Sequence, residues 1–426
     1  MRAGTLQMSL KERERMRVMS RVKEGGMKLT EAKMLLGVSY RQCKRIYRRY
    51  REEGDGGLIH RSRGRPSNCK KDSGFREAVV RRYEERYDGF GPTHACEKLV
   101  KEGYELHHDT LRRWLVAEGL WGRRRKRKHH RSWRERKAHR GEMVQMDGSP
   151  HDWFEGRGEP AVLMDMVDDA TGVTFAQFHE GETTRAAMLT FWGYIERCGI
   201  PLSLYVDKDT VYVSRREATV EEQLAGEGAL TQFGRAVQKL GVRIITANSA
   251  QAKGRVERKH GVYQDRLVKE MRLEGIRTRE EGNAFLERGF LKDLNDRFTV
   301  APRSDVDLHR PVPEGVDLRS VFCFEEKRSV DNDWTVRWHN RIFQIGKENR
   351  VLPPARKRVK VQEWLDGSIH IFYRGEEVSY GELAEKPVRA KKQIEATVTT
   401  RRSCVPAPDH PWRRYPITSM VAASPR

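Results

Sequence analysis

Three acidic residues, Asp147, Asp207 and Glu257, stand at positions where their carboxylates could hold divalent metal ions. Asp147 and Asp207 each end an apolar run that is typical of a buried strand, and Glu257 lies near the start of a segment with helical character. Hard cations such as Mg²⁺ take oxygen ligands, and rigid strands and helices keep such ligands at fixed separations. The three acids therefore suit a two-metal site for phosphoryl transfer.

The alternative is that these acids are unrelated turn and cap residues, which is the usual role of an acid after an apolar run. The surroundings of Glu257 argue against coincidence. Gly254 and Gly261 would each cost a helix about 1 kcal/mol relative to Ala, and we expect both on the side of Glu257, where small residues let another backbone approach. Basic residues crowd this acid and are expected to contact phosphate: Lys253, Arg255, Arg258 and Lys259.

Other carboxylates compete for the same role. Asp165, Asp168 and Asp169 all lie between Asp147 and Asp207 in the sequence. Asp168 and Asp169 begin a turn that ends at Gly172, and Asp is favoured in turns because its side chain hydrogen-bonds nearby backbone. We therefore interpret Asp168 and Asp169 as structural residues.

Short apolar runs alternate with helical patterns from residue 143 to about residue 275. The order predicts three meandering strands followed by two strands reached through helical crossovers, which makes a mixed α/β sheet. We expect strands at 143–147, 161–167, 173–178, 202–206 and 242–246, and helices at 182–198, 229–240 and 252–272.

The composition indicates a polyanionic partner. The chain has 83 Lys and Arg against 61 Asp and Glu, a formal net charge of +22, which favours DNA or RNA first and an anionic membrane second. A merely basic protein is the alternative. The six cysteines are scattered without a CxxC pair, so we expect reduced thiols. No apolar run approaches the roughly 18 residues of a membrane span, and we expect a cytoplasmic protein without a membrane partner.

Residues 1–66 are predicted to form a helix-turn-helix domain with a basic extension. Thr30 and Ser39 are the expected helix caps, and Gly37 supplies the backbone freedom of the turn. The helix at 40–51 suits the major groove of DNA, although a three-helix unit without DNA contact would share the pattern. Its expected DNA contacts are Arg41, Lys44, Arg45 and Arg48.

Residues 61–67 form a short Arg-Gly-Arg segment that is expected to be extended and is similar to an AT-hook. Arg63 and Arg65 would then enter a narrow minor groove, whereas the alternative is a plain basic linker. The rest of the chain is expected to contain a second helix-turn-helix-like domain at 67–122, a basic linker at 123–140, the catalytic core at 141–300, a small β-barrel at 301–385 and a basic, disordered tail at 386–426.

Four segments carry a resemblance to a known family: 146–153, 167–172, 205–207 and 247–258. With them the chain resembles a bacterial insertion-sequence transposase of the DDE class, most similar to the ISNCY family, with a retroviral-integrase-like core. The resemblance covers nearly the whole chain and implies a ribonuclease-H-like fold.

The resemblance places the catalytic triad on Asp147, Asp207 and Glu257. It implies two Mg²⁺ ions per active site, with Mn²⁺ as an alternative metal. Water would cut the element's 3′ ends, and the freed 3′-OH groups would then attack target DNA. Many relatives have Asn-Gly after the second Asp, where this chain has Lys208 and Asp209, so Asp209 is a rival ligand.

The same resemblance implies DNA as partner, both element ends and target, and a dimer or tetramer that forms on DNA in the bacterial nucleoid. Two other functions stay open at this point. The chain could be a sequence-specific DNA-binding regulator with an inactive integrase-like fold, or a nuclease that processes RNA.

Overall fold

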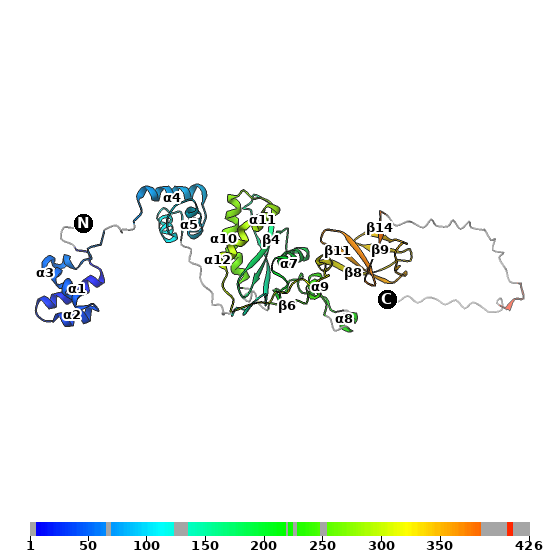
Figure 1. Ribbon diagram of the computed structural model, residues 1–426, viewed down its shortest axis with the longest axis horizontal. Helices are drawn as coiled ribbons and strands as arrows, with labels where there is room; N and C mark the ends of the chain where they lie inside the picture. The colour runs from blue at the N-terminus through cyan, green and yellow to red at the C-terminus, as the bar shows by residue number, and fades with distance from the viewer. Residues whose placement is uncertain are drawn as a thin grey trace. The chain divides into compact units, whose positions relative to one another are not determined.

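The computed structural model describes residues 6–64, 70–122, 135–218, 220–224, 228–247, 254–384 and 407–411. Most of the expected basic linker and most of the expected disordered tail lie outside these residues. The chain divides into two compact units, and Figure 1 labels helices and strands of both. One consists of residues 1–130 with 263–275, and the other of residues 131–262 with 276–426. Residues 263–275, which fall inside the expected catalytic core, thus belong to the N-terminal unit.

The N-terminal unit begins with a helix-turn-helix domain. Its helices are α1 (Leu10–Lys23), α2 (Leu29–Leu36), α3 (Tyr40–Glu53) and the 3-10 helix η1 (Gly54–Leu58). Gly37 ends α2 in the left-handed conformation, with φ of 60°, and Ser39 caps α3 by accepting a hydrogen bond from the Gln42 N–H. The prediction of Thr30 as a cap was wrong, because α2 already begins at Leu29. The small core includes Met19, Ala32, Cys43, Ile46 and Leu58.

A second helical domain follows in the same unit, with α4 (Ser73–Arg86), α5 (Pro92–Lys101) and α6 (His108–Ala117). Its core contains Tyr83, Phe90, Leu99, Leu111 and Leu115, and Leu273 at the end of helix α10 (Val256–Leu273) packs against it. Ion pairs also join α10 to α5. Arg266 binds Glu97 at 2.7 Å, and Glu270 contacts His94 and Lys98. The C-terminal half of α10 is therefore a structural part of this domain.

The central sheet domain contains β2 (Val144–His151), β3 (Ala161–Asp168), β4 (Thr174–His179), β5 (Ser203–Val206) and β6 (Arg243–Thr246). The strands lie in the order β4-β3-β2-β5-β6; β2, β3 and β4 are antiparallel, and β5 and β6 run parallel to β2. Helices α7 (Thr184–Cys198), α8 (Val220–Leu224) and α9 (Gln232–Lys239) lie in the connections. This confirms the predicted mixed α/β sheet with two strands reached through helical crossovers.

Helices cover the outer strand β4. Two asparagine side chains form hydrogen bonds with the backbone at its free edge. Asn283 of α11 (Arg279–Phe285) bonds the N–H and the C=O of Phe178. Asn295 of α12 (Leu291–Phe298) bonds the N–H and the C=O of Thr174. The π-helical segment η3 (Leu286–Phe290) joins these helices. Such bonds satisfy backbone groups that an exposed edge would offer to another strand.

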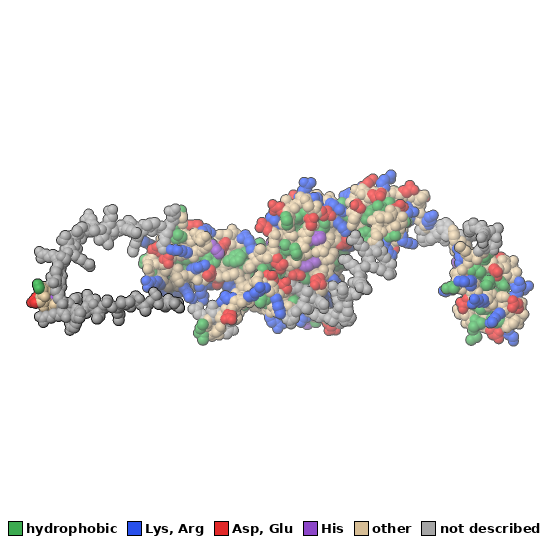
Figure 2. Space-filling view, turned by 180° about the vertical axis from the view of Figure 1, so that it is seen from behind, with side chains coloured by type: hydrophobic (Ala, Val, Ile, Leu, Met, Phe, Trp, Pro, Cys, Tyr) green, Lys and Arg blue, Asp and Glu red, His purple; other side chains and the backbone are tan. Residues whose placement is uncertain are grey.

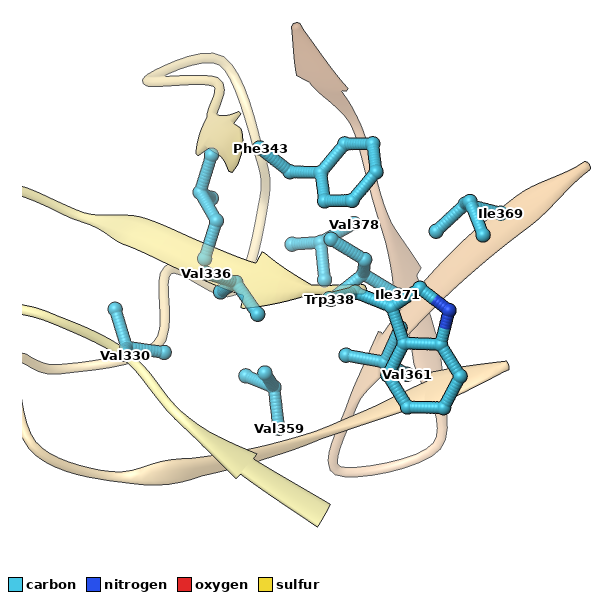
Figure 3. Close-up of a cluster of buried hydrophobic side chains, with 10 residues drawn as sticks. Val330, Val336, Trp338, Phe343, Val359, Val361, Ile369, Ile371 and Val378 are labelled. Atoms are coloured by element: carbon cyan, nitrogen blue, oxygen red, sulfur yellow. The ribbon is translucent and has the colours of Figure 1, made fainter. Parts of the chain in front are cut away.

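The C-terminal β-domain consists of two antiparallel sheets around one core. One sheet has β9 (Thr335–Trp338), β10 (Arg341–Ile345) and β14 (Tyr380–Leu383), and the other has β8 (Cys323–Ser329), β11 (Arg358–Trp364), β12 (Ile369–Tyr373) and β13 (Glu376–Val378). Val336, Trp338, Phe343, Val361 and Ile371 face one another between the sheets (Figure 3). Within the described residues the two sheets do not close through strand pairing, so closure into the expected barrel stays a prediction.

Three small elements complete the second unit. The short strands β1 (His139–Arg140) and β7 (Ser304–Asp307) pair in parallel, and α13 (Leu318–Val321) precedes β8. No helix in the described ranges combines the length and the apolar character that crossing a bilayer requires.

Candidate active site

Asp147 and Asp207 lie on neighbouring parallel strands. Gln145 of β2 pairs with Tyr205 of β5. Asp147 lies two residues after Gln145, and Asp207 lies two residues after Tyr205. Because side chains alternate between faces with a period of two, we expect Asp147 and Asp207, which directly follows the end of β5, to extend from the same face of the sheet. Both are partly exposed.

Glu257 lies in the first turn of α10. The backbone N–H of Val256 donates a hydrogen bond to the side-chain Oε1 of Gln145 at 3.4 Å. Gln145 is two residues before Asp147 and is on the same face of β2. The start of α10 therefore lies on the sheet face that carries Asp147, and the structure brings all three predicted acids to one region.

The carboxylates are not collapsed onto one another. Among the described residues, the one group of three His, Cys, Asp or Glu side chains whose ligand atoms all lie within 4.8 Å is His107, His108 and Asp109. That group sits at the start of α6, where His107 accepts a hydrogen bond from the Asp109 N–H as helix cap, so capping accounts for it.

Asp209, the alternative ligand to Asp207, is exposed, and its side chain forms a hydrogen bond with the backbone of its own loop. Its Oδ1 accepts a hydrogen bond from the Val211 N–H at 2.9 Å, while its own N–H donates to Oδ1 of Asp207 at 2.9 Å. The loop geometry thus uses the Asp209 side chain as a turn residue and holds Asp207 in place. The assignment of the ligand to Asp207 remains a prediction.

Glu182, just before α7, is a nearby acid that the sequence analysis did not single out. Burial raises its pKa, and the charges of Asp147, Asp207 and Asp209 raise it further. The Tyr212 hydroxyl donates a hydrogen bond to its Oε1 at 3.3 Å. In sequence Glu182 looks like a residue of a polar loop before a helix, and only the fold places it beside the other acids.

Asp165 is a second acid that the fold brings in. It lies directly opposite Asp147 in the β2–β3 pair, is completely buried and accepts a hydrogen bond from the Thr174 hydroxyl. Burial raises its pKa to about 7, and the neighbouring Asp147 contributes in the same direction, against the opposite influence of Lys259. When ionised, Asp165 therefore adds to the negative potential around Asp147.

Lys259 and Arg255 turn inward in the structure. Lys259 is buried, interacts electrostatically with Asp165, and lies over the Phe298 ring at 5.9 Å. Arg255 forms an ion pair with Asp169 at 2.7 Å and its side chain is 11% exposed. Arg258 is exposed, while Lys253 lies outside the described residues. Contact of these residues with phosphate stays a prediction, but Arg255 and Lys259 have internal partners.

The two glycines near Glu257 differ from their expected positions. Gly254 precedes the helix and is part of a turn. Gly261 is exposed, and a Cβ built on it would meet nothing within 4 Å. The expectation that small residues here admit another backbone was therefore wrong for Gly261 within the chain itself.

The predicted DNA-contacting side chains of α3 are exposed and form one basic surface. Arg41, Lys44, Arg45 and Arg48 line a shallow depression of about 650 Å³ together with Arg51. Cys43 and Ile46 point the other way into the core. Basic side chains also lie on the surface of the other folded parts of the chain (Figure 2).

The Arg-Gly-Arg segment differs from its prediction. Residues 61–64 form a turn, closed by a hydrogen bond from the Arg63 N–H to the His60 carbonyl at 2.8 Å. The guanidinium of Arg63 binds the carboxylate of Glu12, so the expectation of an extended segment was wrong for this part. Hydrogen bonds from the Ser9 backbone and from Arg63 lower the pKa of Glu12 to about 2. Arg65 lies outside the described residues.

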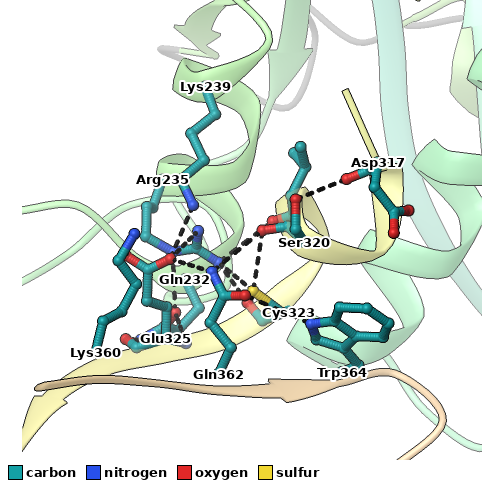
Figure 4. A network of polar contacts seen from close by, with 11 residues as sticks. Gln232, Arg235, Lys239, Asp317, Ser320, Cys323, Glu325, Lys360, Gln362 and Trp364 are labelled. Atoms are coloured by element: carbon teal, nitrogen blue, oxygen red, sulfur yellow. Dashed lines mark hydrogen bonds and ion pairs between the residues drawn. The ribbon is translucent and has the colours of Figure 1, made fainter. Parts of the chain in front are cut away.

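A basic groove of about 1600 Å³ separates the central sheet domain from the β-domain. Its edge includes Thr184 and Thr210, close in sequence to Glu182 and Asp209. Beneath it, a polar network of α9 and β8 joins the two domains (Figure 4): Arg235 donates to the Cys323 carbonyl, and Lys239 binds Glu325 at 2.8 Å. The charged lining residues are Arg216, Arg235, Lys239, Lys327, Arg328, Arg337 and Arg358, with Glu325, Glu326 and Asp331 as the acids.

Comparison with known proteins identifies the family. The chain is 37% identical over 381 residues to the "Putative transposase y4bF" of Sinorhizobium fredii, an alignment that covers 88% of this chain and 82% of that protein. The chain belongs to the transposase family. The present chain is also 26% identical over 444 residues to the transposase for insertion sequence IS1202 of Streptococcus pneumoniae. This alignment covers 95% of the present chain and 94% of that relative.

A family model described as a helix-turn-helix domain matches residues 14–67 of the transposase. It confirms the helix-turn-helix domain predicted from the sequence. Among solved structures, the chain is similar to a simian T-cell lymphotropic virus intasome in complex with the PP2A regulatory subunit B56 gamma, with 13% identity, a TM-score of 0.32 and coverage of 72% of this chain and 100% of that chain. The chain is also similar to the HTLV-2 integrase catalytic core domain in complex with magnesium, with 17% identity and a TM-score of 0.27. This similarity covers 35% of the present chain and 84% of that chain.

Proposed function

We propose that this transposase binds the ends of its insertion sequence, cleaves them at the 3′ strands and joins them to target DNA, with Asp147, Asp207 and Glu257 as the DDE triad. The observation that supports the proposal is that Asp147 lies on β2 and Asp207 directly follows the neighbouring parallel strand β5, while the start of α10 is bonded to β2 through Gln145.

The donor set fits divalent metal ions. All three triad members offer carboxylate oxygens, the ligands that Mg²⁺ prefers. Further negative charge from Glu182 and Asp165 surrounds them, and a cation would relieve the repulsion that contributes to the raised pKa values of these two acids. Asp147, Asp207 and Glu257 would together hold two Mg²⁺ ions. Bound ions would activate the attacking oxygen and stabilise the leaving oxygen.

The reaction would consist of two displacements at phosphorus. In the first, a water oxygen bonds to the phosphorus at the element's end, the bond to the element's 3′ oxygen breaks, and this oxygen becomes a 3′-OH. In the second, that 3′-OH oxygen loses its proton and bonds to a target phosphorus, and a target 3′ oxygen leaves. The triad carboxylates act as ligands rather than as general bases.

The DNA would be held by surfaces outside the triad. The basic face of α3 suits base-specific contacts in the major groove of the element's ends. The groove between the central sheet domain and the β-domain suits phosphate contacts, because its basic lining outnumbers its acidic lining and it passes close to Thr210 in the loop after Asp207. The network between α9 and β8 fixes the two walls of this groove relative to each other.

Joining two ends to one target requires two triads, and each chain supplies one. We therefore include in the proposal that two or four chains assemble on DNA. The assembly would act on DNA in the bacterial nucleoid.

Incubation of the purified chain with Mg²⁺ and a DNA fragment that carries both element ends tests the proposal. We expect nicks at the two 3′ ends and, with added plasmid, joined products; Mn²⁺ should replace Mg²⁺ and EDTA should stop the reaction. Specific end binding without any cleavage would instead support the regulator with an inactive core. Cleavage of RNA without preference for the ends would support the third function.

A further inference from the structure

A buried cluster of three side chains holds the start of α10 against the sheet. Asp169 lies at its centre: its Oδ1 accepts hydrogen bonds from Gln145 Nε2 and from Arg255 Nη1, each at 2.7 Å, and its Oδ2 accepts one from the Lys137 N–H at 2.9 Å. Asp169 and Gln145 have no exposed surface. We call Gln145, Asp169 and Arg255 the anchor cluster.

The anchor cluster connects two members of the triad. Gln145 is two residues before Asp147 on the same face of β2, and Arg255 is two residues before Glu257. Gln145 also accepts a hydrogen bond from the N–H of Val256 at 3.4 Å. One amide and one carboxylate therefore link the strand of the first acid to the helix of the third, although these two acids lie far apart in the sequence.

The chemistry of the cluster favours a fixed geometry over simple stability. An ion pair between Asp169 and an Arg255 side chain that is 11% exposed is directional and charge-assisted. Burying such a pair costs desolvation, so apolar residues of similar size would stabilise the fold about as well. What the polar cluster adds is one defined orientation of the first turn of α10.

We propose that Gln145, Asp169 and Arg255 are positioning residues that fix Glu257 relative to Asp147. The inference rests on the proposed function of Glu257 as a metal ligand. It replaces two sequence-based interpretations, namely Asp169 as a turn residue alone and Arg255 as a phosphate contact.

The adjacent residue Asp168 provides a matched control. It is buried in the same turn, but its carboxylate accepts hydrogen bonds from the Gly141 N–H and from the N–H and hydroxyl of Thr171. Asp168→Asn therefore perturbs the turn, whereas Asp169→Asn and Arg255→Gln perturb the link to α10. All variants are compared in the intact chain.

Three measurements separate positioning from folding: the thermal midpoint, Mn²⁺ affinity by calorimetry, and amide hydrogen exchange of residues 256–262. A fourth, end-DNA binding, tests for a phosphate contact. We expect Asp169→Asn and Arg255→Gln to speed this exchange and weaken Mn²⁺ binding, each by about tenfold or more, with end-DNA binding changed by less than about twofold. The double variant should be no worse than either single variant, because the two residues act as one link. Asp168→Asn should lower the midpoint without these selective effects.

Equal losses in Asp168→Asn and Asp169→Asn across all three measurements would overturn the proposal and leave a folding role only. A loss of DNA binding in Arg255→Gln that exceeds the loss of Mn²⁺ affinity would overturn it in favour of a phosphate contact. Failure of the proposed function looks different: the wild-type chain would bind no Mn²⁺ and cut no ends, while the exchange of 256–262 would still report on the anchor cluster.

Discussion

The carboxylate of Glu182 fills the space beside Gly148 that a side chain would otherwise occupy. A Cβ built on Gly148 would lie 2.5 Å from Oε2 of Glu182. Gly148 directly follows Asp147, so the missing side chain lets a further acid approach the triad. The Tyr212 hydroxyl donates a hydrogen bond to Oε1 of Glu182 at 3.3 Å.

This relationship predicts that Glu182 strengthens metal binding. Glu182→Gln keeps the shape and removes a negative charge, so we expect the Mg²⁺ concentration for half-maximal cleavage to rise several-fold, with little change in end binding. Gly148→Ala should have a similar effect because the new methyl group displaces the carboxylate. An unchanged Mg²⁺ requirement in both variants would show that Glu182 has no part in the metal site.

The triad variants should separate chemistry from binding. Asp147→Ala, Asp207→Ala and Glu257→Ala are each expected to abolish cleavage and strand transfer, because each removes a ligand, while end binding by α3 stays nearly intact. Asp209→Ala is the control and should retain substantial activity, since its side chain serves its own turn. Robust cleavage by any triad variant would remove that residue from the site.

The two basic surfaces should differ in sequence dependence. Replacing Arg41 and Lys44 with Ala should weaken binding to element ends more than to random DNA, because base contacts carry specificity. Replacing Arg337 and Arg358 in the groove with Ala should weaken both about equally and flatten the salt dependence. Gel-shift titrations at several salt concentrations measure both, and equal weakening by the α3 variant would contradict its recognition role.

The ion-pair cluster of Glu270 predicts a pH-dependent stability of the N-terminal unit. Burial raises the pKa of Glu270, but its contacts with His94 and Lys98 outweigh burial and bring it to about 2. A lowered pKa contributes stability that is present above about pH 4.5 and is lost as the pH falls toward 2. In urea unfolding at about pH 6, the free energy of unfolding of the wild type should exceed that of Glu270→Gln by roughly 1–3 kcal/mol. This difference should shrink as the pH falls toward 2. Exposed Glu84→Gln on α4 controls for loss of a surface charge.

Mixed assemblies test whether a chain cuts the end that it binds. One partner carries Glu257→Gln, and the other lacks residues 1–69 but keeps α4, α5 and α6, because α5 forms ion pairs with α10. Each should be inactive alone. Recovered cleavage in the mixture would mean that an end bound by one chain is cut by another, whereas no recovery despite proven co-assembly would mean cutting by the same chain.

Local chemistry was enough to predict much of this protein. The cap at Ser39 and the turn at Gly37 define the helix-turn-helix, and the apolar runs before Asp147 and Asp207 define the strands, because helix and strand periodicity are local properties.

Tertiary structure decided which distant groups meet. The loop before α7 brings Glu182 close to Asp147, and the pairing of β2 with β3 places Asp165 opposite Asp147. Asp169 forms an ion pair with Arg255, which is distant in the sequence. No local pattern marks such residues, since an Asp in a turn looks the same whether its carboxylate faces solvent or a helix far along the chain. The sequence alone predicted the helices and strands and proposed the three triad positions. Only the packed fold determined which charges are buried together, because burial depends on neighbours that lie far away in the sequence.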